Sequence, residues 1–255
     1  PQCYCGFFIF NQMSINEITI CWIIIGLIVL PINLYYKAPY GRHSSKKWGV
    51  LIDNKIGWML MEFQALIVCP ITYLLIEDYI NQNFLFIILW IIHYFNRTII
   101  FPFKIKTKGK KMPLLIACSA FCFNLVNGLL NGYFLTVIDF KNLSIPLLIT
   151  GLIVYLAGLY INIISDNKLI KLRENKKGYS IPNGGLFNII SCPNFFGEIL
   201  EWLGFAIMTF NLASLSFFIW TCCNLIPRGL AHHKWYKENF EEYSKKRKAI
   251  IPYFL

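Results

Sequence analysis

Charged residues are scarce in this sequence. Asp, Glu, Lys and Arg make up 15% of its 255 residues, whereas hydrophobic residues make up 56% and aromatic residues 17%, and the mean hydropathy is +0.53. Average soluble chains carry roughly a quarter charged residues, from which their polar surface is built. The shortage excludes an ordinary soluble domain and indicates a protein that is surrounded by lipid.

Several catalytic signatures are also missing. The sequence has neither a Walker A loop nor a GxGxxG motif, it does not support a Ser-His-Asp or Cys-His hydrolase, and none of its nine cysteines forms a CxxC pair. Most cysteines lie in apolar runs, where we expect small apolar side chains without redox function: Cys21, Cys69, Cys118, Cys122, Cys222 and Cys223. The adjacent His232 and His233 would point about 100° apart on a helix, so we expect no metal site.

Basic residues exceed acidic ones by 24 to 13, which gives a net charge of +11. In a soluble protein this excess would suggest binding to nucleic acid. Here the basic residues lie in short segments between apolar runs, as in the cytoplasmic loops of membrane proteins. We therefore expect the lipid bilayer as a partner and no nucleic acid, and no obligate protein partner is evident.

A transmembrane helix needs about 20 largely apolar residues. Seven runs are candidates for such helices: 15–36, 56–76, 84–103, 112–138, 143–165, 195–210 and 212–226. The first has no preceding basic region and no small-residue cleavage site, so it predicts a retained span and not a signal peptide. The last two are short and flank Asn211, which predicts either a tight helical hairpin or one long broken helix.

Segments rich in Lys and Arg follow the first, third, fifth and last of these runs. The three segments between them hold Glu77 and Asp78, then Asp139 and Lys141, and then no charge. Because basic loops stay in the cytoplasm, this alternation favours an odd number of spans. It predicts an all-α, polytopic membrane protein with seven transmembrane helices, an outside N-terminus and a cytoplasmic C-terminus.

Ionisable side chains at membrane depth are costly and mark functional sites by default. They include Glu62 in the second run, Arg97 in the third and Glu198 in the sixth. Glu62 and Arg97 have an alternative interpretation as a structural salt bridge, and polar residues near span ends are often helix caps. Together the polar groups are too many for ion pairs alone, and most lie near the predicted cytoplasmic ends. We expect them to line one cavity that opens to the cytosol.

These residues fall within longer motifs. They are Asn162-Ile-x-Ser165-Asp166, Tyr179-x-Ile-Pro182-x-Gly-Gly-Leu-Phe187, Asn194-Phe-x-Gly-Glu198-Ile-x-Glu201-Trp202, Arg228-x-x-x-His232, and Phe240-Glu-x-Tyr243 through Arg247-Lys-x-Ile-Ile-Pro252. Upstream stand Tyr40-Gly-Arg-His43, Trp58-x-x-x-Glu62, His93-Tyr94-Phe-x-Arg97-Thr and Asn127-Gly-x-x-x-Gly132-Tyr. In this order, over nearly the whole chain, they resemble the steroid 5-alpha-reductase family.

The resemblance implies a seven-span oxidoreductase that transfers hydride from NADPH to the 4,5 double bond of 3-oxo-4-ene steroids. Glu62 and Tyr94 match the pair that holds the substrate carbonyl, and Trp58 and Phe123 would pack on the steroid. The residues that the resemblance assigns to NADPH are Arg97, Lys110, Asn162, Asp166, Arg173, Tyr179, Asn194, Glu198, Arg228, His232 and Tyr236. Residues 1–255 would form a single domain, with spans 1–4 (15–138) on the substrate side and the rest (143–255) on the cofactor side.

The chain departs from the family pattern at three places. Ser180 stands where a basic residue is usual, and Lys177 is a candidate to replace that phosphate contact. Met61 replaces a glutamine, and Lys110 replaces an arginine, so it would act as a point charge without bidentate geometry. None of these changes removes a chemically essential group.

The implied chemistry requires that charge developing on the carbonyl oxygen of an enone is stabilised. A protonated carboxyl group and a phenol suit this task, as in ketosteroid isomerase. The α-carbon would then take a proton from solvent or a nearby group. Reduction of a polyprenal or an enoyl thioester, a methyltransferase that resembles isoprenylcysteine methyltransferases, and a non-catalytic sterol binder remain alternatives. The location would be the endoplasmic reticulum membrane in a eukaryote or the inner membrane in a bacterium.

Overall fold

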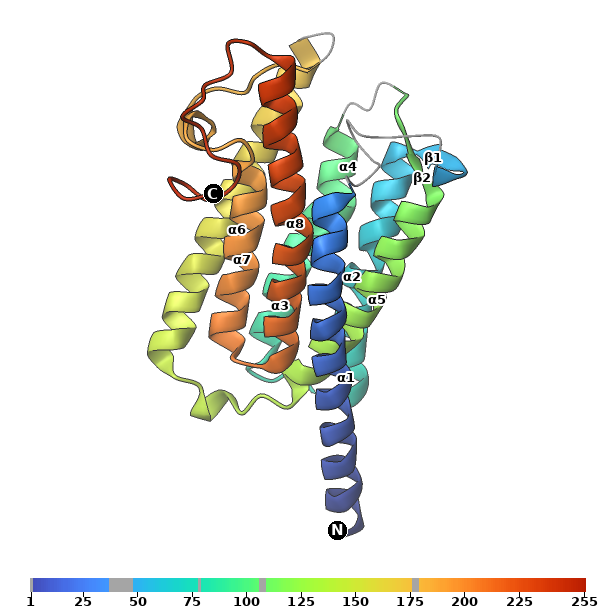
Figure 1. Cartoon of the computed structure of the whole chain (residues 1–255). Helices are drawn as coiled ribbons and strands as arrows, with labels where there is room; N and C mark the ends of the chain where they lie inside the picture. The colour runs from blue at the N-terminus through green and yellow to red at the C-terminus, as the bar shows by residue number, and fades with distance from the viewer. Residues whose placement is uncertain (1, 37–47, 78, 106–108, 176–178) are drawn as a thin grey trace.

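Seven long helices dominate the part of the chain that the computed structural model describes, residues 2–36, 48–77, 79–105, 109–175 and 179–255. Their bounds are Gln2–Tyr35 (α1), Asn54–Ile76 (α2), Phe84–Phe95 (α3), Leu114–Thr136 (α5), Ile145–Asn175 (α6), Pro193–Thr209 (α7) and Leu212–Asn239 (α8). A π-helical turn, Asn96–Ile100 (η3), joins α3 to the short α4, Phe101–Lys104. Further 3₁₀ turns are formed by Phe140–Asn142 (η4) and Gly185–Asn188 (η5). Figure 1 shows one elongated bundle.

Five helical segments of the described residues are long and apolar enough to cross a membrane. They are Ser14–Tyr35, Asn54–Ile76, Phe84–Lys104, Leu114–Thr136 and Ile145–Arg173. Each corresponds to one of the first five predicted spans. The sixth and seventh spans stay a prediction, because α7 has only 17 residues and α8 carries charged residues over its second half.

The outer surfaces of these helices are apolar. Ile28, Leu75 and Ile153, on α1, α2 and α6, are among many large hydrophobic side chains that are exposed on the protein surface. Large contiguous apolar surfaces are rare on soluble monomers. In a bilayer they contact hydrocarbon, and the helical backbone satisfies its own hydrogen bonds.

The described loops divide between the two ends of the bundle. Figure 1 shows α4, the strands and the C-terminal segment (residues 240–255) at one end, and the α5–α6 and α7–α8 connections at the other. Lys104, Lys110 and Arg173 belong to the first end, and Asp139 belongs to the second. This arrangement agrees with the alternation of basic segments along the sequence. Tyr40 to His43, Asp78 and Lys177 lie outside the described residues.

A short two-stranded antiparallel sheet is an element that an all-α prediction does not include. Leu51–Asp53 (β1) pairs with Lys111–Pro113 (β2). Asp53 also caps α2, because its carboxylate accepts hydrogen bonds from the backbone N–H groups of Lys55 and Ile56, at 2.8 and 3.3 Å. The sheet therefore holds Lys110 beside the start of α2, where the Asn54 N–H donates to the Lys110 carbonyl at 3.2 Å.

Helices α6 and α7 pack at backbone contact. A Cβ atom added to Gly158 would stand 2.3 Å from the backbone nitrogen of Glu201, and one added to Gly204 would stand 2.3 Å from that of Tyr155. Small residues allow such close approach between membrane helices, which dispersion and interhelical hydrogen bonds then stabilise. This contact fixes the alignment of the polar residues that α6 and α7 carry.

The turn between α7 and α8 is a tight hairpin, which decides between the two predicted alternatives. Phe210 has a left-handed φ of 45° and ends α7. Asn211 then caps α8, with its side-chain oxygen accepting from the Ser214 N–H at 2.9 Å. Helix α8 extends to Asn239, well beyond the predicted end of the last run at residue 226.

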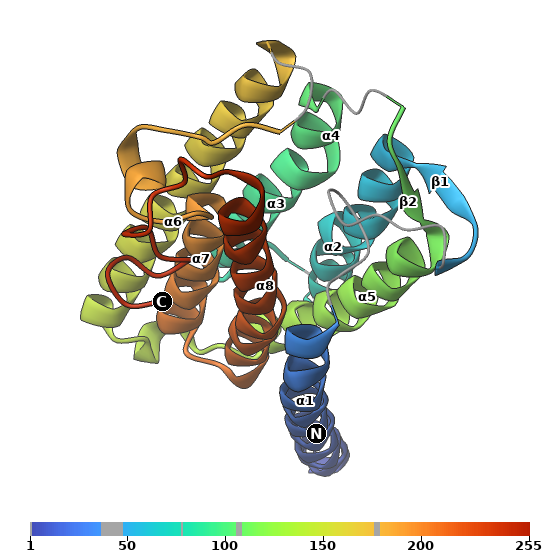
Figure 2. The same ribbon diagram turned by 45° about the horizontal axis from the view of Figure 1, so that its top comes forward.

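A core of aromatic side chains fills the centre of the bundle. Trp90 of α3 lies 5.3 Å from Trp202 of α7 and 5.3 Å from Phe217 of α8, measured between ring centroids. The Trp90 indole N–H donates to the Ala65 carbonyl of α2 at 2.7 Å. These contacts explain why α3 lies between the α2–α5 pair and the α6–α8 group in Figure 2.

Candidate active site

Two pairs of polar residues face each other across the α6–α7 contact. Asn162 and Asp166 are four residues apart on α6, and so are Asn194 and Glu198 on α7, so each pair shares one helix face. The Asn194 amide donates to Asp166 at 2.9 Å. The Asn162 amide donates to the Asn194 carbonyl at 3.0 Å and to Glu198 at 3.3 Å.

Arg97 joins this network from a third element. Its guanidinium nitrogens lie 2.9 Å from Asp166 and 3.3 Å from Glu198, and all three side chains are largely buried. Arg97 belongs to the π-helical turn, in which the Phe101 N–H donates to the Asn96 carbonyl. Such turns often occur at functional sites. The ion pairs of Arg97 are thus with Asp166 and Glu198, two carboxylates that the interpretation of Arg97 as a structural partner of Glu62 does not include.

Glu62 and Tyr94 lie beside this network, on α2 and α3. Glu62 accepts from the Asn124 amide at 3.5 Å, and it lies within electrostatic range of Arg97, Glu198 and His93. Tyr94 is within range of Glu62, and its ring packs 5.0 Å from that of Trp90. The two residues that the resemblance pairs thus lie in one region of the bundle, with Tyr94 buried and Glu62 half-buried.

Sequence reasoning did not pair His93 with Glu201. The imidazole Nδ1 lies 2.8 Å from the Glu201 carboxylate, and the two side chains are 2% and 0% exposed. The His93 ring also meets the rings of Tyr94 and Trp202 edge-on, at 4.9 and 4.7 Å. Both residues belong to the sequence motifs and lie inside predicted spans, and this is the sequence feature from which their contact could have been inferred.

Residues at the basic end of the bundle form a second group. The Lys110 ammonium donates to the Tyr179 hydroxyl at 2.9 Å, and the Arg173 guanidinium lies 5.7 Å from the Tyr179 ring. Tyr179 in turn contacts the Trp235 ring of α8 at 5.3 Å. Two cations from distant segments therefore meet at one tyrosine.

The last three cofactor candidates share one face of α8, since Arg228, His232 and Tyr236 follow at intervals of four residues. Phe195 of α7 packs between the first two, 4.8 Å from the Arg228 guanidinium and 5.7 Å from the His232 ring. Phe195 is the neighbour of Asn194. The α8 face is thereby attached to the start of α7.

The two substrate candidates lie in different surroundings. Trp58 is near the polar network, with its ring 5.5 Å from the Arg97 guanidinium and 5.4 Å from the Phe101 ring. Phe123 packs among apolar rings, 5.0 Å from Trp220 and 6.1 Å from Trp22. Trp58 thus lies where polar and apolar parts of the site meet, whereas Phe123 belongs to the apolar part.

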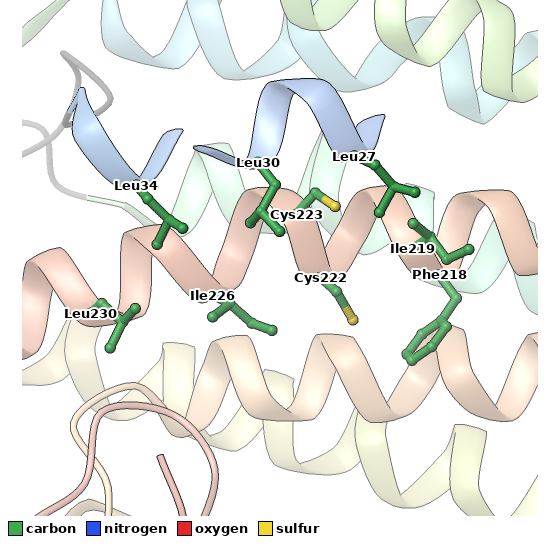
Figure 3. Close-up of a pocket in the computed structure, with 9 residues that line it drawn as sticks. All are labelled: Leu27, Leu30, Leu34, Phe218, Ile219, Cys222, Cys223, Ile226 and Leu230. Carbon is green, nitrogen blue, oxygen red and sulfur yellow. The ribbon is translucent and has the colours of Figure 1, made fainter. Parts of the chain in front are cut away.

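A separate apolar pocket of about 430 Å³ lies between α1 and α8. Figure 3 shows its lining, Leu27, Leu30, Leu34, Phe218, Ile219, Cys222, Cys223, Ile226 and Leu230. None of these is a predicted site residue, and a lining without polar groups does not bind a nucleotide. Within the described residues, no group of three or more His, Cys, Asp and Glu side chains is placed to hold a metal ion.

Comparison with known proteins decides the family. The family model described as 3-oxo-5-alpha-steroid 4-dehydrogenase matches residues 110–255. Steroid 5-alpha-reductase DET2 of Arabidopsis thaliana is 41% identical over 231 residues, which cover 86% of this chain and 88% of the relative. The chain belongs to the steroid 5-alpha-reductase family.

Animal members of the family are similar over a comparable length. The 3-oxo-5-alpha-steroid 4-dehydrogenase 1 of Bos taurus is 35% identical over 246 residues, 92% of each chain. The enzyme of the same name from Homo sapiens is 34% identical over 237 residues, 90% of this chain and 91% of the relative. This member of the family is therefore an oxidoreductase of steroid metabolism that acts on a CH–CH bond, and a membrane protein.

Proposed function

We propose that this reductase uses NADPH to reduce the 4,5 double bond of 3-oxo-4-ene steroids, with Glu62 and Tyr94 polarising the C3 carbonyl. The observation that supports it most is the position of Glu62 and Tyr94 beside the network formed by Arg97, Asp166 and Glu198. A network of this kind offers polar partners for a cofactor next to groups suited to an enone oxygen. Its location between apolar helices suits a lipophilic substrate that enters from the bilayer.

The residues present fit a dinucleotide. Carboxylates and side-chain amides suit hydroxyl and carboxamide groups, and the buried side-chain oxygen of Asn162 has no hydrogen-bond partner. Lys110, Arg173 and Arg228 would supply positive charge to phosphates. Asn162, Asp166, Asn194 and Glu198, together with Arg97, would hold the neutral and sugar portions, while Tyr179, His232 and Tyr236 would add ring contacts. When bound, NADPH supplies the hydride.

Glu62 and Tyr94 would act on the substrate oxygen. A protonated Glu62 carboxyl and the Tyr94 hydroxyl would both donate hydrogen bonds to the C3 carbonyl, which makes the β-carbon of the enone more electrophilic. The surrounding aromatic rings of Trp90 and Trp202 exclude water and thus strengthen these hydrogen bonds. Trp58 and Phe123 would contact the apolar faces of the steroid.

The proposed topology places this chemistry across a bilayer. Seven spans, with α7 and α8 as the sixth and seventh, would put the N-terminus outside and the C-terminal segment in the cytoplasm. The basic end of the bundle would then face the cytosol, from which the cofactor would enter. Scanning with single cysteines and a membrane-impermeant thiol reagent in intact cells tests this orientation: Lys245→Cys should react only after permeabilisation.

Purified protein in detergent micelles tests the reaction. We expect NADPH oxidation on addition of testosterone or progesterone, with 5α-reduced products identified by mass spectrometry against standards. A polyprenal and an enoyl thioester serve as competing conjugated carbonyl substrates. Nicotinamide fluorescence reports NADPH binding independently of turnover. If only the polyprenal or the enoyl thioester were reduced, the proposed steroid substrate would be wrong. If the protein bound no NADPH, the proposed function as a whole would be refuted.

A further inference from the structure

Ser191 lies outside the proposed catalytic machinery, yet its hydroxyl has an unusual number of partners. Its oxygen is 2.6 Å from His233 Nδ1, 2.6 Å from the Tyr243 hydroxyl and 3.1 Å from the Lys248 carbonyl. The three partners come from α8 and from the C-terminal segment. Both Ser191 and Tyr243 are buried.

The hydrogens of this cluster can be assigned by counting donors and acceptors. The Lys248 carbonyl only accepts, so Ser191 donates its single proton there. The two lone pairs of the hydroxyl then accept from the Tyr243 O–H and from His233 Nδ1–H, so the single donor and both acceptor positions of the Ser191 hydroxyl are used. His233 is neutral in this arrangement, because burial and the nearby Lys237 and Lys248 lower its pKa to about 4.

Ser191 and two of its three partners, His233 and Tyr243, each lie next to a residue proposed to bind the cofactor. Ser191 comes directly before the first turn of α7, which carries Asn194. His233 follows His232 on α8. The Tyr243 ring stacks on that of Tyr236, with centroids 5.2 Å apart and an angle of 7° between the planes.

Backbone contacts hold the C-terminal segment against the same region. The Ser191 N–H donates to the Lys248 carbonyl at 2.9 Å, and the Lys248 N–H donates to the Ile189 carbonyl at 2.8 Å. The Arg247 guanidinium donates to the Pro182 carbonyl at 2.9 Å. These bonds attach the segment to the loop before α7, whereas the Ser191 hydroxyl links that loop to side chains of α8 and of the segment.

We propose that Ser191 is a positioning residue for the cofactor site: its hydroxyl aligns the start of α7, the polar face of α8 and the C-terminal segment with one another. This inference rests on the proposed use of NADPH. Without the hydroxyl, the Tyr243 O–H and the His233 N–H lose a buried acceptor. The neighbouring Tyr236 and His232 are then no longer held in a fixed position relative to α7. The affinity for NADPH falls, while the chemistry at Glu62 and Tyr94 is preserved.

The test compares Ser191→Ala with Ser214→Ala. Ser214 is a suitable control because it is also buried and its hydroxyl contacts Thr209 and Asn211, at 2.7 and 3.0 Å, in the turn at the other end of α8. Ser191→Ala should raise the Kd for NADPH, measured by nicotinamide fluorescence, about tenfold, because binding must then also order the groups that the hydroxyl no longer aligns. Its kcat and its KM for steroid should stay within about twofold of wild type. Ser214→Ala should leave the Kd unchanged.

Two further variants cover the case in which Ser191→Ala does not fold. Ser191→Thr keeps the hydroxyl and should restore the Kd, and Tyr243→Phe removes one donor and should raise it by a smaller factor. Tryptic cleavage at the exposed Lys245 and Lys246 should be faster in Ser191→Ala and Tyr243→Phe. Equal Kd values in wild type, Ser191→Ala and Tyr243→Phe would overturn the inference alone. A wild-type protein that binds no NADPH would overturn the proposed function and this inference with it.

Discussion

The guanidinium of Arg97, a residue of the π-helical turn η3, lies 2.9 Å from the carboxylate of Asp166 on α6. The same guanidinium lies 3.3 Å from Glu198 of α7. One cation thus holds two carboxylates of separate helices within a largely apolar bundle. A buried cluster of this kind is costly if a charge is left without a partner, as both carboxylates would be without Arg97.

Replacing Asp166 should impair cofactor binding more than fold stability. Asp166→Asn keeps the shape of the side chain and leaves Arg97 paired with Glu198, so the protein should fold. The lost charge should raise the Kd for NADPH about tenfold or more, because hydrogen bonds to charged groups contribute ~1.5–3 kcal/mol. Nicotinamide fluorescence measures the Kd. Asp139→Asn is the matched control at the other end of the bundle, and an equal effect of both variants would contradict the assignment.

The Glu62 and Tyr94 pair should govern turnover and not cofactor binding. Glu62→Gln and Tyr94→Phe should each lower kcat about 100-fold, the loss typical of one hydrogen-bond donor to a developing oxyanion. The Kd for NADPH should change little. Single-turnover reduction of testosterone measures the effect, with Tyr79→Phe as the control because Tyr79 is exposed. Near-normal rates in both variants would eliminate the pair as the carbonyl-binding groups.

The contact between α6 and α7 should tolerate no added methyl group at Gly158. Its Cβ would stand 2.3 Å from the Glu201 backbone nitrogen, so the helices must separate. Overpacking of this kind costs roughly 1–3 kcal/mol. Gly158→Ala should therefore lower the denaturation temperature in detergent and weaken NADPH binding, since Asn162 lies one turn further along α6. Ala157→Val enlarges the side chain at the neighbouring exposed position and should change neither the denaturation temperature nor the Kd for NADPH. A Gly158→Ala variant with wild-type stability and a normal Kd would refute the close packing.

His233 should make the protein less stable in mild acid. Its pKa in the folded state is lowered to about 4 by burial, Lys237 and Lys248, against an ordinary value of about 6.5 in the unfolded chain. Its contribution to stability is therefore complete above about pH 6.5 and is lost as the pH falls toward 4. Solvent screening at this half-buried site reduces the effect to about 1 kcal/mol. Denaturation temperatures between pH 7.5 and 4.5 should fall more steeply for wild type than for His233→Gln. Parallel curves would exclude His233 as the titrating group.

Much of the fold could be predicted because it depends on composition. The first five apolar runs all became helices, since lipid-exposed helices need long apolar stretches. The runs 56–76, 84–103 and 112–138 match their helices closely, whereas α1 begins earlier than predicted, at Gln2, and α6 ends later, at Asn175. The end of α8 could not be predicted in this way, because Arg228, His232 and Tyr236 end the apolar run without ending the helix. That part of α8 packs against α7 and the C-terminal segment, and such tertiary contacts leave no periodic apolar signal.

The candidate site, like the fold, could be predicted only in part. Spacing within one helix is readable, so Asn162 with Asp166 and Asn194 with Glu198 could be grouped before the structure was known. Contacts between helices are not readable from spacing. The His93–Glu201 pair and the three-way bonding of Ser191 depend on which helices are neighbours, and a serine in a loop carries no sequence signal for its partners.

The fate of the nicotinamide hydrogen tests the central claim most directly. Purified protein would be incubated with testosterone and NADPH that carries deuterium at both C4 positions of the nicotinamide ring. The account predicts a 5α-reduced product with one deuterium, located at C5 by NMR, and none at C4. A product without deuterium at C5, or NADPH that is bound but never oxidised with any 3-oxo-4-ene steroid, would contradict it.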